Sequence, residues 1–86
     1  MTSDLDRAST ADVLDRLTET LHTRFEVPRA LLTPDARFAS LDLDSLAIEE
    51  FGMMIANDFG QEIWTSYDDS FTLAQAAHAL ALGRPL

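Results

Sequence analysis

Apolar residues recur every three or four positions in three separate segments of this chain, and this spacing constrains its fold more than any other feature. In the first segment the recurring residues are Val13, Leu14, Leu17, Leu21 and Phe25. Ser9 precedes them and, with Asp12, forms an N-cap with an acidic third position. The segment is therefore predicted to be an amphipathic helix over residues 10–25, with Arg16 and Glu19 on its solvent side.

A second helix is predicted to begin at Asp44 or Ser45. It runs to about Phe59, because Gly60 suits the end of a helix. At about 100° per residue, one broad face of this helix is apolar and is expected to lie against the core. The residues of that face are Ala47, Ile48, Phe51, Met54 and Ile55, with Phe59 at its margin.

The last helix is predicted to start after Thr72, because Thr72 and Gln75 form a capping-box pattern. It ends at Gly83, where glycine favours the left-handed backbone that terminates many helices. The residues expected to face inward are Leu73, Ala76, Ala77 and Leu80. Before this helix, residues 68–70 are expected to form one turn.

The connection between the first two helices, residues 26–43, is long for a compact domain. Its apolar residues favour packing onto the core, and a short helical turn is expected after Pro28. The sequence contains no internal repeat and no convincing strand. These features predict an all-α fold over residues 9–84, a small bundle of three long helices plus one short helix. The mostly polar residues 1–8 are expected to be flexible.

The charge balance limits the partners of the protein. Fifteen acidic residues against six arginines and no lysine give a net charge of −9, which disfavours binding to nucleic acid or to anionic membranes. Partners are expected to present basic surfaces. Because the chain has no cysteine, thiol catalysis, thiolate metal sites and disulfides are excluded. It has no membrane-spanning run and no signal peptide, and we expect a cytoplasmic monomer.

The outer side of the second helix combines apolar and acidic residues. The helical phase places Glu49, Gly52 and Ala56 on the Ser45 side, and Leu46, Glu50, Met53 and Asn57 along the flanks. Leu46 and Met53 are thus apolar residues that point toward water. Together with Glu49 and Glu50 they predict a surface that binds partners. The alternative for Leu46 is a local contact with the long connection.

Ser45 lies where the long connection becomes a helix, and two interpretations remain open for it. Either Ser45 or the neighbouring Asp44 acts only as the helix N-cap. Alternatively, the Ser45 hydroxyl is presented for chemical modification. A phosphate attached to that hydroxyl would be favoured by the unpaired N–H groups and the positive dipole end of the helix.

The sequence Asp44-Ser45-Leu46, placed after a long loop and at the start of an acidic amphipathic helix, resembles the attachment site of acyl carrier proteins. The order and spacing of the predicted helices are similar to that family over nearly the whole chain. Glu50 and Phe51 resemble the Glu-Leu-like pair that usually follows the motif, and Met53 resembles an exposed hydrophobic position used for partner contacts.

The resemblance implies a specific cofactor and specific partners. It implies a carrier domain over residues 9–84 with a 4′-phosphopantetheine arm from coenzyme A on Ser45, and Asp44 orienting the modifying enzyme or its metal ion. The protein would be no enzyme but the substrate of a phosphopantetheinyl transferase. It would carry an acyl or aminoacyl unit between a loading enzyme and a downstream synthase or transferase of a specialised pathway, such as polyketide or nonribosomal peptide synthesis. The docking residues implied are Leu46, Glu49, Glu50 and Met53.

The chain also departs from that family. Asp42 stands where glycine is usual, and Glu49 stands where valine is frequent. Ala56 and Asn57 replace an acidic pair late in the second helix. The Gly-Gly-x-Ser signature of many peptidyl carriers is absent. These departures favour a discrete carrier of a specialised pathway over a partner of a general fatty-acid synthase.

The sequence disfavours two other functions and leaves one main alternative. A serine hydrolase is disfavoured because His78 is predicted on the solvent side and no Gly-x-Ser-x-Gly elbow is present. A calcium loop starting at Asp42 would need glycine at position 47 and glutamate at position 53, and the chain has neither. The main alternative is a non-catalytic acidic interaction module with a carrier-like fold and no arm.

Overall fold

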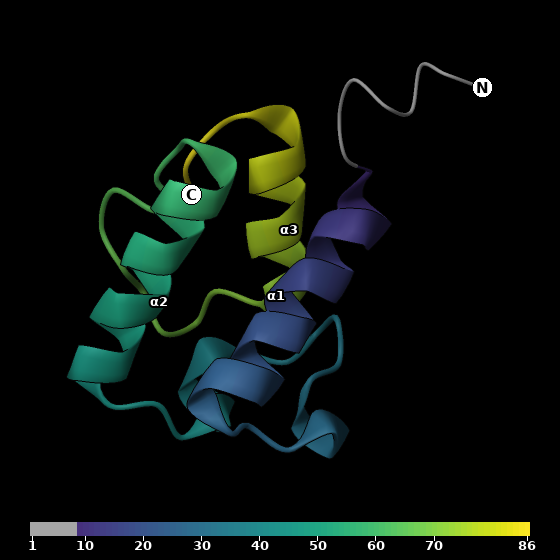
Figure 1. The fold of residues 1–86 in the computed structure, drawn as a ribbon, viewed down its shortest axis with the longest axis vertical. Helices are drawn as coiled ribbons and strands as arrows, with labels where there is room; N and C mark the ends of the chain where they lie inside the picture. The colour runs from purple at the N-terminus through teal and green to yellow at the C-terminus, as the bar shows by residue number, and fades with distance from the viewer. Residues whose placement is uncertain (1–8) are drawn as a thin grey trace.

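Three helices form the fold of residues 9–86, the part of the chain that the computed structural model describes (Figure 1). They are α1 (Thr10–Phe25), α2 (Ser45–Phe59) and α3 (Leu73–Leu82). No strand forms within these residues, and a single isolated antiparallel bridge joins Arg37 to Thr72. The predicted all-α class is confirmed, whereas the flexibility predicted for residues 1–8 concerns a segment outside the described residues.

The helix boundaries follow the capping residues of the sequence. Ser9 accepts a hydrogen bond from the Asp12 N–H at 3.1 Å at the start of α1. At the start of α3 the Thr72 hydroxyl accepts from the Gln75 N–H, and the Gln75 side chain accepts from the Thr72 N–H, at 3.1 and 2.8 Å. Gly60 ends α2 in the left-handed conformation, with φ 71°. The predicted capping box and helix ends are therefore confirmed.

The long connection between α1 and α2 packs onto the bundle, as predicted. It contains two short 3₁₀ turns, η2 (Arg29–Leu31) directly after Pro28 and η3 (Phe38–Leu41). The apolar residues that it buries are Val27, Leu32, Phe38 and Leu41. The turn after Pro28 was expected, whereas η3 was not. Between α2 and α3 the chain makes a turn at Asp69–Ser70.

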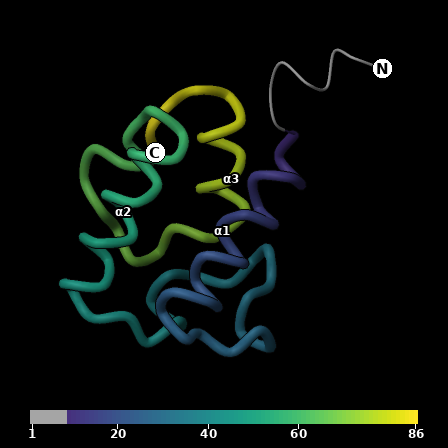
Figure 2. Tube along the Cα trace, in the orientation of Figure 1, coloured from purple at the N-terminus to yellow at the C-terminus, as the bar shows by residue number. Residues whose placement is uncertain are grey.

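The helices approach one another to different degrees. α1 packs closely along α3, where Ala76 and Ala77 are fully buried, because small side chains allow close backbone approach. Figure 2 shows α2 standing apart from this pair, and the chain after α2 returning along it before crossing to the start of α3. No helix of residues 9–86 has both the length and the apolar character needed to cross a membrane.

The face that α2 buries is narrower than predicted. Ile48, Phe51 and Ile55 are buried, but Ala47 and Met54 are only partly covered. Met54 was predicted to belong to the core face. α2 contacts the core through Ile48, Phe51 and Ile55, and its backbone packs less closely on the other helices than α1 packs on α3, so residues beside this stripe stay partly exposed.

Phe51→Ala is expected to lower the free energy of unfolding by about 3–5 kcal/mol, because it empties a fully buried site between three aromatic rings. Met53→Ala, two residues away, removes a side chain that is 71% exposed and is expected to change it by less than about 0.5 kcal/mol. Urea denaturation followed by circular dichroism measures both. Equal losses would contradict the orientation of α2.

Candidate functional site

The N-terminus of α2 is capped by Asp44. Its Oδ1 accepts a hydrogen bond from the Ala47 N–H at 2.8 Å, and its backbone oxygen accepts from the Ile48 N–H at 3.0 Å. Asp44 has the extended backbone of an N-cap, with φ −81° and ψ 175°. Of the two residues considered for this role, the structure therefore selects Asp44.

Ser45 is the first residue of α2, and it is exposed. Its hydroxyl takes part in none of the side-chain hydrogen bonds found within residues 9–86. The interpretation of Ser45 as the N-cap is thus wrong, because Asp44 already satisfies that role. The hydroxyl stands at the positive end of the helix dipole and is accessible to a reagent from solution.

A left-handed residue directs the chain into this site. Asp42 follows η3 with φ 59° and ψ 37°, a conformation that glycine adopts without strain and that aspartate tolerates better than most residues. Asp42 thus makes the turn that brings Asp44 and Ser45 to the start of α2.

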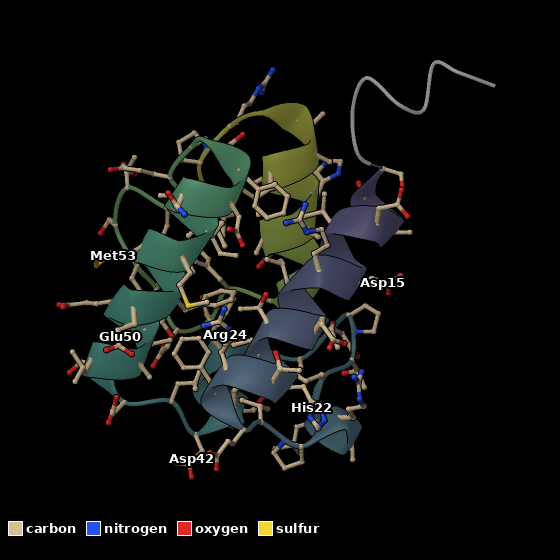
Figure 3. The ribbon with its side chains drawn as sticks, viewed as in Figure 1. Asp15, His22, Arg24, Asp42, Glu50 and Met53 are labelled. Atoms are coloured by element: carbon tan, nitrogen blue, oxygen red, sulfur yellow. The ribbon has the colours of Figure 1, made fainter. Side chains whose placement is uncertain are left out.

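The predicted docking residues lie together on the outer side of α2. Leu46 is 62% exposed and Met53 is 71% exposed, and Glu49 and Glu50 are exposed as well. In Figure 3, Glu50 and Met53 project from the side of α2 that faces away from α1. The exposure of Leu46 contradicts the alternative in which it folds back onto the long connection.

A cavity of about 390 Å³ opens beside Ser45. The residues that line it include Phe38, Leu43, Ser45, Ile48, Tyr67 and Asp69. Its walls are mainly apolar and aromatic, with Glu49 and Asp69 as the acidic members. This cavity could not be predicted from the sequence, because its walls come from η3, α2 and the connection before α3, which only the folded chain brings together.

A second cavity of about 370 Å³ lies farther along α2, between this helix and residues 62–64. Gly52 forms part of its floor, where a Cβ atom would lie 3.6 Å from Cζ2 of Trp64. Gly52 was predicted to face away from the core, and the structure shows that the Trp64 indole covers it. A glycine inside a helix and a single tryptophan in a connector were the only sequence signs of this contact.

Neither histidine is paired with Ser45. His78 is exposed on α3, as predicted, and His22 lies at the boundary of the core, where its Nδ1 is 2.9 Å from the backbone oxygen of Val27. Within the described part of the chain, no group of three or more acidic or histidine side chains is placed to hold a metal ion. The Asp42–Asp44 segment thus forms no calcium cluster in residues 9–86.

No protein-family model, no curated protein and no solved structure matches this chain.

Asp44→Ala is expected to lower the free energy of unfolding by about 1 kcal/mol, because it removes the side-chain acceptor of the Ala47 N–H. Ser45→Ala is expected to leave stability within about 0.5 kcal/mol of the original protein, since its hydroxyl holds nothing in place. Thermal or urea unfolding of both variants tests this assignment. A larger loss for Ser45→Ala would return the capping role to Ser45.

Tyr67 lines the cavity beside Ser45. Burial raises the pKa of its hydroxyl above the usual 10.0, and the negative charges of Asp69 and Asp68 raise it further. Asp69→Asn is therefore expected to lower the pKa of Tyr67, and Asp35→Asn, a change of equal charge at a carboxylate that is not a cause of the shift, to lower it less. Absorbance at the phenolate band reports the only tyrosine directly. Because folding raises this pKa, the contribution of Tyr67 to stability is complete below pH 10 and is lost as the pH rises through the folded-state pKa.

Proposed function

We propose that the protein is a discrete carrier that holds an acyl or aminoacyl group on a 4′-phosphopantetheine arm attached to Ser45. The observation that carries the proposal is the division of roles at the start of α2. Asp44 caps the helix, and Ser45 keeps a free and exposed hydroxyl. A serine that acted as the helix cap would accept a hydrogen bond from a backbone N–H through its hydroxyl, and the Ser45 hydroxyl does not.

The residues around Ser45 suit the phosphate of such an arm. Of the first four backbone N–H groups of α2, those of Ala47 and Ile48 donate to Asp44, whereas those of Ser45 and Leu46 make no hydrogen bond with the described residues. A phosphodiester on the Ser45 oxygen would lie close to these two donors and to the positive end of the helix dipole. That environment offsets part of the repulsion between the attached phosphate and nearby carboxylates such as that of Asp44.

Attachment is a phosphoryl-type transfer in which the chain acts as the acceptor. The Ser45 oxygen bonds to the phosphorus next to pantetheine in coenzyme A, the bond to the nucleotide phosphate breaks, and the hydroxyl proton passes to a base of the transferase. We assign to Asp44 the orientation of that enzyme or of its Mg²⁺. When bound, the arm supplies the thiol that this cysteine-free chain lacks, and that thiol carries the cargo as a thioester.

The outer side of α2 would present Ser45 to successive enzymes. Leu46 and Met53 provide apolar contacts, and Glu49 and Glu50 attract basic surfaces. Long-range attraction by a net charge of −9 raises encounter rates more than it slows dissociation. That balance suits a shuttle in the cytoplasm, which must meet a phosphopantetheinyl transferase, a loading enzyme and an accepting synthase or transferase in turn.

The decisive experiment is the intact mass of the purified protein before and after incubation with coenzyme A, Mg²⁺ and a broad-specificity phosphopantetheinyl transferase. We expect a gain of one phosphopantetheine in the original protein and none in Ser45→Ala. Ser66→Ala is the matched control, because it removes another exposed serine hydroxyl and should leave the gain intact. A folded protein that gains no mass would instead support the interaction module without an arm.

A further inference from the structure

The cavity between α2 and residues 62–64, here called the Trp64 groove, combines acidic, apolar and aromatic side chains. The residues that line it include Glu49, Gly52, Met53, Glu62 and Trp64. Three of them lie on one side of α2, and two come from the connection that follows it. The groove is therefore a composite surface that α2 alone does not provide.

The Trp64 wall of the groove is held in place from behind. The indole packs edge-to-face with Phe38 and Tyr67, at ring-centre distances of 5.4 and 4.8 Å. The neighbouring Ile63 is 1% exposed, and its backbone oxygen accepts from the Leu86 N–H at 2.8 Å. On its α2 side the indole lies close to Gly52, where a Cβ atom would meet it at an ordinary contact distance of 3.6 Å. The groove is thus formed before any partner arrives.

The groove is negatively charged and lacks a cation of its own. The ion pairs within residues 9–86 are Arg16–Asp58 and Arg29–Glu19, so no described arginine pairs with Glu49 or Glu62. Both glutamates are exposed. The groove therefore brings two unpaired carboxylates, one aromatic ring and the flexible apolar Met53 to a single hollow.

We propose that the Trp64 groove binds an arginine side chain of a partner protein, with its guanidinium against Trp64 and paired with Glu49 and Glu62. A planar guanidinium both stacks on aromatic rings and pairs with carboxylates, whereas a lysine ammonium is more strongly hydrated and has no flat face. The net charge of −9 favours a basic protein surface over nucleic acid. The partner's neighbouring apolar side chains lie on Met53, which is 71% exposed.

The position of the groove fits delivery of Ser45 to an active site. Gly52 follows Ser45 by seven residues, which is about 10 Å along a helix. Both residues lie on the same side of α2, and Glu49 lies between them and lines both cavities. A partner anchored by its arginine in the groove is therefore aligned along α2 toward Ser45. In this respect the inference rests on the proposed carrier function, although the binding site itself does not.

The test uses the unmodified protein, labelled with ¹⁵N, and two small probes of similar shape, n-butylguanidinium and the neutral n-butylurea. The single tryptophan gives one indole N–H signal, which reports on the groove directly. We expect n-butylguanidinium to shift this signal and the Gly52 amide signal in a saturable manner at millimolar concentration, and n-butylurea to leave them nearly unchanged. n-Butylammonium should bind more weakly than the guanidinium.

The double variant Glu49→Gln/Glu62→Gln is expected to weaken guanidinium binding roughly five- to tenfold, because it removes both exposed charge pairs. The matched control, Asp15→Asn/Asp35→Asn, removes the same number of negative charges at exposed sites outside the groove and should bind as the original protein does. Equal shifts with the urea, or equal weakening in both double variants, would overturn the proposal.

The outcomes for the groove and for the carrier function are separable, because the probe titration needs neither the arm nor a transferase. Loss of guanidinium selectivity in a protein that still gains a phosphopantetheine would reject the groove alone. Selective binding in a protein that gains no mass would keep the arginine site and reject the carrier function.

Discussion

The packing of aromatic rings around Phe51 is the interaction on which the rest of the structure depends. Phe51 projects from α2 and meets Phe25 of α1, Phe38 of η3 and Trp64 of the last connection, with ring centres 5.9 to 6.3 Å apart. One buried side chain thus joins four segments that are distant in sequence. Because α2 is fixed by this contact and by Ile48 and Ile55, its opposite side is turned to solvent, and Ser45 stands at its exposed end.

Two aspartates shape the start of α2. Asp42 makes a left-handed turn, and Asp44 uses its carboxylate to cap the helix. Each of these aspartates takes a structural task that would otherwise fall to the backbone or to Ser45. The consequence is an exposed Ser45 hydroxyl that makes no hydrogen bond within the described residues, as the proposed attachment of an arm to Ser45 requires.

The outer surface of the molecule extends this arrangement along α2. The same tryptophan that packs against Phe51 and Phe38 on its inner side lines the groove on its outer side, above Gly52. The core and the proposed docking surface are therefore coupled through one residue. Exposed glutamates surround this surface, and the weak, salt-sensitive attraction that they provide is appropriate to partners that must be exchanged.

The sequence by itself determined the three helices, their caps and ends, the packing of the long connection and the exposure of Met53, because helical periodicity and capping depend on residues within a few positions of one another. It placed Ser45 at the start of a helix but left open whether Ser45 or Asp44 capped it, since both residue types suit that role. The structure assigns the cap to Asp44 through a local hydrogen bond from the Ala47 N–H, three residues along the chain. Only the tertiary structure excluded Met54 from the buried face of α2 and set Trp64 against Gly52. These last two outcomes depend on contacts between segments that no local pattern relates, and the two cavities along α2 arise from the same contacts.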